Sequence, residues 1–92
     1  MKQENATQSV ITLVIAGNAI RFTPSEAIYN KFVNEMTMDN KVAPAKNYLM
    51  RCVHPEDREA LEKIIHKPGA PMQIVAKLNE DFAADLEVAV KK

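Results

Sequence analysis

Three side chains in this chain could bind a soft metal ion, and one of them could act as a nucleophile: Cys52, His54 and His66. A structural zinc site needs four ligands, normally arranged as two closely spaced pairs. The chain has a single cysteine, and the Cys52-x-His54 spacing is too short for a usual zinc half-site. We therefore expect no metal site and no cofactor.

Cys52 and His54 could also form a nucleophile and base pair, but that chemistry needs an oxyanion hole and hydrogen-bond contact between the two groups. Cys52 falls on the same helical face as Leu49 and Val53, where a buried and unreactive thiol is the usual outcome. Only two glycines are present, so a loop that cradles phosphate is not available either. The sequence predicts that the protein is not an enzyme and that it acts by binding.

The overall composition limits what could be bound and where. Twelve basic and twelve acidic residues cancel in a chain of 92 residues, whereas nucleic-acid-binding domains are usually visibly basic. One cysteine cannot form an internal disulfide, which favours a reducing compartment. The polar N-terminus has no apolar signal region, and the apolar run 10–16 is too short to span a bilayer. We expect a cytoplasmic protein with no membrane association, and nucleic acid is an unfavoured partner.

The pattern of apolar residues predicts the elements that position these side chains. Segments 9–15 and 19–22 are dense in β-branched and apolar residues around an Ala-Gly-Asn turn, which predicts a β-hairpin. Thr23 followed by Pro24 is a helix-start signal. Helical spacing predicts four helices near 24–36, 44–53, 55–67 and 72–83.

The C-terminal residues Leu86, Val88 and Val90 alternate with polar or small residues, which predicts a third strand. The expected fold is α+β in the order ββααααβ: an N-terminal hairpin and a C-terminal strand form a three-stranded sheet, covered by four short helices. We expect residues 1–8 to be a disordered tail and residues 9–92 to be a single domain.

One polar segment is the best candidate for a partner-binding surface. Between Asp39 and Glu56 there is no acidic residue, and the three basic residues give a local charge of plus three. The segment is either a docking patch for an acidic or polar partner or an ordinary solvated helix face. Thioether side chains adapt to varied apolar partners. The candidate partner-binding residues are Met38, Asn40, Lys41, Lys46, Asn47, Met50 and Arg51, and the methionines expected in the core are Met36 and Met72.

Three stretches of the chain resemble a known family. These are YNKFVNEM at 29–36, NKVAPAKNYLMR at 40–51 and PGAPMQIV at 68–75. They are similar to small phage tail assembly chaperones of prophages and tailed phages, and the similarity extends over nearly the whole chain after residue 9. The family has no agreed catalytic or ligand-binding residues, so the resemblance assigns none here.

The resemblance implies a non-enzymatic chaperone of the infected or lysogenic bacterial cytoplasm. Such a protein holds the tape-measure protein or tail-tube protein soluble before the tail polymerises, and it is absent from the mature virion. The sequence leaves open a homo-oligomer, a longer frameshifted form, and one alternative function. That alternative is a small cytoplasmic adaptor or nucleic-acid-associated regulator that uses the basic Lys41–Arg51 segment.

Overall fold

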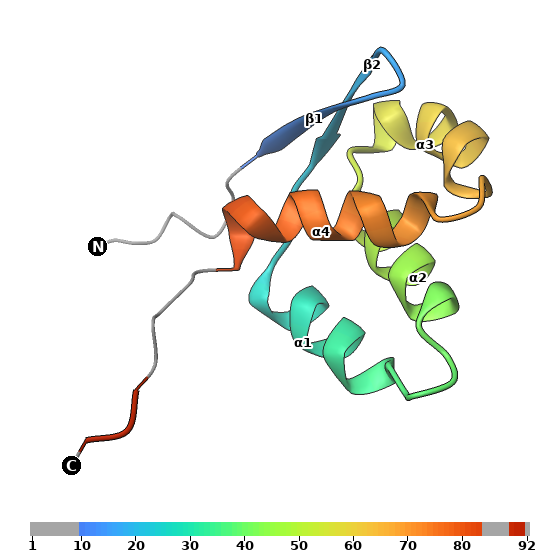
Figure 1. Ribbon diagram of the computed structural model, residues 1–92. Helices are drawn as coiled ribbons and strands as arrows, with labels where there is room; N and C mark the ends of the chain where they lie inside the picture. The colour runs from blue at the N-terminus through green and yellow to red at the C-terminus, as the bar shows by residue number, and fades with distance from the viewer. Residues whose placement is uncertain (1–9, 84–88, 92) are drawn as a thin grey trace.

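The computed structural model describes residues 10–83 and 89–91. A β-hairpin is followed by a series of helices, and the hairpin lies to one side of them (Figure 1). In chain order the elements are β1 (Ile11–Ile15), β2 (Asn18–Phe22), α1 (Glu26–Glu35), α2 (Val42–Cys52), the 3-10 helix η2 (Pro55–Asp57), α3 (Arg58–Ile65) and α4 (Ala70–Phe82).

The hairpin closes through a two-residue turn, Ala16-Gly17, in which both residues have positive φ. This conformation matches the right-handed twist of the two strands. Ile11 pairs with Phe22 and Ile15 with Asn18 in an antiparallel register. Side chains alternate along a strand, so Ile11, Leu13 and Ile15 pack against the core while the residues between them are exposed. The sequence could not distinguish the two faces of this strand because both are apolar.

The expected three-stranded sheet is wrong, because the sheet has two strands among the described residues. Most of the predicted C-terminal strand and the predicted tail 1–8 lie outside those residues, and the described residues 89–91 form no strand. The free edge of β2 pairs with the connection between α2 and α3, which the sequence did not predict. The backbone N–H of His54 donates to the carbonyl of Arg21 at 2.8 Å, and that of Thr23 donates to the carbonyl of Cys52 at 2.7 Å. The alternation of apolar and polar residues at the C-terminus is a local pattern, and it does not establish that the segment pairs with the hairpin.

Arg21 fixes this connection through its side chain as well as its backbone. Its Nε donates to Asp57 at 2.8 Å and its terminal nitrogen donates to the second oxygen of the same carboxylate at 3.1 Å. The backbone N–H of Arg21 donates to Asp57 at 2.8 Å, and a longer contact of 3.2 Å reaches Glu56. One carboxylate therefore accepts three hydrogen bonds from one residue of β2, and its side chain is only 15% exposed.

The start of α1 depends on which residue is free to cap the helix. The first helix begins after Ser25, whose hydroxyl accepts from the backbone N–H of Ile28 at 3.2 Å. The sequence indicated Thr23 as this N-cap, but its backbone N–H and its hydroxyl both donate to the carbonyl of Cys52. Pro24 is fully buried. The hairpin therefore runs directly into its pairing with residues 52–54, and the helix begins later than predicted.

Four of the five aromatic residues in the chain form one cluster that joins α1, α2 and α4. Phe32 stacks on Tyr48 with ring centroids 4.7 Å apart. Tyr29 contacts both of them and Phe82. Tyr48 is completely buried, and its hydroxyl donates to the side-chain oxygen of Asn79 in α4 at 2.9 Å. Offset and edge contacts of this kind add stability beyond the area that they bury.

Aliphatic side chains complete the core between the hairpin and the helices. Those buried beneath the hairpin and between α2, α3 and α4 are Ile20, Leu49, Val53, Leu61, Ile64, Ile65, Ile74, Val75 and Leu78. Met72, expected in the core, is more than a third exposed. It lies in the first turn of α4, beyond the face that packs on the other helices.

We expect Asp57→Asn to destabilise the fold more than Glu56→Gln, because Asp57 accepts most of the hydrogen bonds of Arg21. The Arg21 side chain and then its backbone amide lower the pKa of Asp57 from 3.8 to about 2. A depressed pKa stabilises the folded state above the unfolded pKa and loses that contribution as the pH falls through the folded pKa.

The difference in urea midpoint between the parent protein and Asp57→Asn should therefore be constant above about pH 5 and shrink as the pH falls from about 4 towards 2. A difference that does not depend on pH would show that the carboxylate charge is not what holds the connection.

We expect Phe32→Ala to cost roughly 3–5 kcal/mol of unfolding free energy, the usual range for deleting a buried aromatic ring. The neighbouring Val33→Ala should cost no more than about 0.5 kcal/mol, because Val33 points outward and is 43% exposed. Denaturant unfolding of both variants is the measurement. Similar losses for the two would place the aromatic cluster outside the core.

Candidate functional site

The candidate segment forms the corner between α1 and α2. Its loop is closed by two reciprocal backbone hydrogen bonds, from Thr37 to Asn40 at 3.1 Å and from Asn40 to Thr37 at 3.4 Å. Met38 lies between them at the tip and is 89% exposed. Figure 1 places this corner on the side of the molecule away from the hairpin turn. A short loop closed in this way holds its apolar tip out from the surface.

Two further apolar side chains are exposed near this tip. Val33 belongs to the outward face of α1, and Val42 is the first residue of α2. Single exposed apolar residues are ordinary on protein surfaces. Here, however, three of them come from the two helix ends and the loop that joins them. The corner therefore presents apolar side chains from adjacent elements rather than one isolated residue.

The basic residues of the segment do not act as a group. Arg51 is bound to Glu35 of α1 through both guanidinium nitrogens, at 3.2 and 3.3 Å. These hydrogen bonds lower the pKa of Glu35 and tie the end of α2 to the end of α1. No salt bridge among the described residues involves Lys41 or Lys46. The local charge of plus three is thus partly neutralised, and the two lysines carry what remains.

Lys41 occupies a position that a helix does not favour for a cation. It is the N-cap of α2, it makes no side-chain capping bond, and the first turn contains no acidic residue. The positive end of the helix dipole disfavours a positive charge there. A residue that disfavours its helix without stabilising the fold elsewhere is often found at a functional site.

The other candidate residues divide between the surface and the core. Asn40 and Asn47 are exposed, and Lys46 is half-buried. Met50 is half-buried and packs partly against the core, and its backbone carbonyl accepts from Arg58 at 3.1 Å. The structure therefore brings Met38, Asn40 and Lys41 together at the exposed corner, while Met50 and Arg51 stabilise the attachment of α2.

The residues that could bind a metal ion or act as a nucleophile lie away from that corner. Cys52 is 1% exposed, and burial raises its pKa to about 12. His54 accepts the backbone N–H of Glu56 at its Nδ1 and caps η2, while His66 ends α3 on the surface. Among residues 10–83 and 89–91, no three His, Cys, Asp or Glu side chains gather into a possible metal site.

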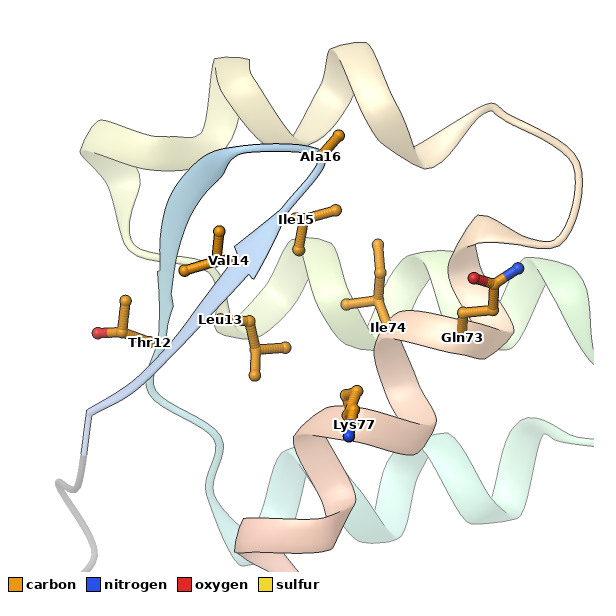
Figure 2. A pocket seen from close by; sticks show the side chains of 8 residues that line it. All are labelled: Thr12, Leu13, Val14, Ile15, Ala16, Gln73, Ile74 and Lys77. Carbon is orange, nitrogen blue, oxygen red and sulfur yellow. The ribbon is translucent and has the colours of Figure 1, made fainter.

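A second surface feature was not indicated by the sequence. A groove of about 380 Å³ runs between β1 and α4 and is lined by Thr12, Leu13, Val14, Ile15, Ala16, Gln73, Ile74 and Lys77 (Figure 2). The lining joins two segments about sixty residues apart in the chain, so no local pattern could reveal it. The sequence did contain one hint about the strand beside the groove, though not about the groove itself: residues 11–15 include no charged residue and no proline. No helix in the part of the chain that the structure describes is long and apolar enough to cross a bilayer.

These features define a small α+β protein with an exposed apolar corner between α1 and α2 and a groove between β1 and α4. The family model for "phage tail assembly chaperone" matches residues 11–92. The chain is also 40% identical over 81 residues to the "uncharacterized 11.3 kDa protein in lys 3′ region" of Haemophilus phage HP1, covering 88% of this chain and 79% of that protein. No solved structure matches. The chain therefore belongs to the phage tail assembly chaperone family, as its sequence resemblance predicted.

We expect the Cys52 thiol to resist alkylation by iodoacetamide at pH 8 in the native protein. In about 6 M urea, which is enough to unfold a small domain, the thiol should react quickly. The reason is that only the thiolate reacts, and burial keeps the thiol protonated. Mass spectrometry of timed samples gives the rate. Equal rates in both conditions would mean that Cys52 is accessible in the native fold.

Proposed function

We propose that this protein is a non-enzymatic chaperone that binds the tape-measure protein, or the tail-tube protein, before the phage tail polymerises. It acts in the cytoplasm of the bacterial host and is left out of the mature virion. Family membership supports a chaperone role in tail assembly. The choice of client and of the compartment is our inference.

The observation that carries the proposal is the exposed apolar corner between α1 and α2. A tape-measure protein is long and helical, and before assembly its unpaired apolar stripes would associate with each other. Met38 at 89% exposure offers a flexible thioether that adapts to several apolar partners. Asn40, exposed in the same loop, would supply a polar contact beside it, and Asn47 is exposed further along α2. This arrangement suits a helical client laid against the corner with its apolar face inward.

Lys41 and Lys46, which form no salt bridge within the described part of the chain, have a different part in the same contact. Charges at the rim of an interface affect the rate of encounter and the orientation of the partner more than they affect affinity. Lys41 and Lys46 would therefore orient an acidic or polar flank of the client. Arg51 is excluded from this role because Glu35 already holds its guanidinium, and its replacement would loosen α2 from α1.

The alternative of a nucleic-acid-associated regulator has less support. Phosphate neutralisation supplies most of the affinity of such proteins, and the net charge here is zero. The basic segment also loses one of its three cations to the Glu35 pair.

Co-expression with the tape-measure protein of the same phage tests the proposal. The parent protein should keep that client in the soluble fraction and be recovered with it in a pull-down. Met38→Asp should weaken recovery by about tenfold, the equivalent of about 1.4 kcal/mol, because it places a charge at the apolar contact. Lys41→Glu with Lys46→Glu should slow association and reverse its dependence on salt.

The matched control is Lys63→Glu with Lys67→Glu, an equal charge change on two exposed lysines near the end of α3. This control should bind like the parent protein. Circular dichroism melts show whether each variant is folded. Full client recovery by a folded Met38→Asp variant would remove the corner from the interface. If neither the tape-measure nor the tail-tube protein is recovered with the parent protein, the proposed function is wrong.

A further inference from the structure

The outer edge of β1 has unpaired backbone groups. In an antiparallel pair, the backbone groups of alternate residues point towards the partner strand and away from it. Arg21 of β2, and Thr23 just after it, hydrogen-bond to segment 52–54, away from β1. The backbone groups of residues 20 and 22 therefore face β1. Their partners are Leu13 and Ile11. The N–H and C=O groups of Thr12 and Val14 therefore point outward, and among the described residues neither group makes a backbone hydrogen bond outside the β1–β2 pair.

Among the residues that the structure describes, this edge carries no charged residue, proline or bulge. Natural proteins block an exposed edge strand with a charged residue, a proline or a bulge. The strand Ile11–Ile15 reads ITLVI, and its pairing with β2 is continuous from end to end. Val14, the fourth of its five residues, is 74% exposed. An open and regular apolar edge of this kind is a template for another strand.

The groove beside this edge could accommodate the side chains of an added strand. Leu13 and Ile15 point towards Ile74 of α4, and Lys77 lies one turn further along the same helix (Figure 2). The apolar side chains form a floor beneath the position that an added strand would take. Because side chains alternate along a strand, every second residue of an added segment would face this floor.

The charge of the groove limits what fits. Lys77 is the only charged residue among the eight that line it. Its Nζ lies 3.4 Å from a carboxylate oxygen of Glu80, and both side chains are mostly exposed, so that pair is weak and exchangeable. A favourable occupant would bring its own carboxylate to Lys77. A second copy of β1 has no charged residue in its strand and does not meet this requirement.

We propose that the β1 edge and its groove bind an extended segment of the tail-protein client by β-strand addition. The segment has apolar residues at alternate positions and an Asp or Glu opposite Lys77. The backbone groups of Thr12 and Val14 hold it in register, and Leu13, Ile15 and Ile74 receive its apolar side chains. This inference rests on the proposed function, but it uses a surface separate from the α1–α2 corner.

Val14→Pro tests the backbone part of the proposal. Proline removes the outward N–H and is tolerated on an edge strand where that N–H is not used within the fold. Val14→Thr is the matched control, because it keeps the N–H and a β-branched shape. With co-expressed tape-measure and tail-tube proteins as the probes, Val14→Pro should reduce client recovery by at least about tenfold, the effect of about 1.4 kcal/mol. Val14→Thr should reduce it far less.

Lys77→Glu tests the charge part without altering the strand. It should weaken client recovery about tenfold at low salt and less at high salt, because salt screens exposed charges over about 10 Å at 0.1 M. Lys63→Glu on α3 is its control and should have no effect. This variant keeps the proposal testable if Val14→Pro does not fold, as judged by circular dichroism.

Two results would overturn the inference while leaving the proposed function intact. The first is full client recovery by a folded Val14→Pro variant or by Lys77→Glu. The second is a parent protein that sediments as a dimer and a Val14→Pro variant that sediments as a monomer with client binding unchanged, since the edge would then belong to a second copy. Failure of the parent protein to recover either client would overturn both proposals.

Discussion

The bond between Arg21 and Asp57 is the constraint on which the rest of the structure depends. A two-stranded hairpin is marginal in isolation, and here the free edge of β2 is completed by the turn between α2 and α3. Arg21 contributes its side chain, its backbone N–H and its carbonyl to that turn. This connection ends α2 and leads into α3. By holding it, one residue of the hairpin fixes the position of both helices relative to the sheet. The Asp57 side chain is 15% exposed and that of Arg21 is 39% exposed, so the carboxylate is the better shielded half of the pair.

The helices depend in turn on contacts that cross between elements. The aromatic cluster joins α1, α2 and α4, and the buried hydroxyl of Tyr48 has a defined partner in Asn79. Glu35 and Arg51 close the end of the α1–α2 pair at the surface. These contacts make the corner around Met38 a fixed projection of the scaffold. A binding residue held in place loses less conformational entropy when its partner arrives.

A chaperone of polymerising subunits has to bind firmly enough to prevent premature association and weakly enough to release. Two small surfaces on one client satisfy both requirements better than one large surface. Each contact alone is modest, while the second becomes effectively intramolecular once the first has formed. In our proposals the apolar corner receives a helical part of the client and the β1 edge receives an extended part. Release of either one would lower the overall affinity sharply.

The sequence by itself determined the family, the hairpin and the four helices, because helical and strand spacing are local properties of the apolar residues. It also indicated that Cys52 lies on a buried face, since its neighbours at helical spacing are apolar. Tertiary structure alone decided that residues 52–54 pair with the free edge of β2. It decided that Arg51 pairs with Glu35 and that β1 and α4 enclose a groove. Those outcomes depend on segments far apart in the chain, and spacing along one segment does not encode its distant partner.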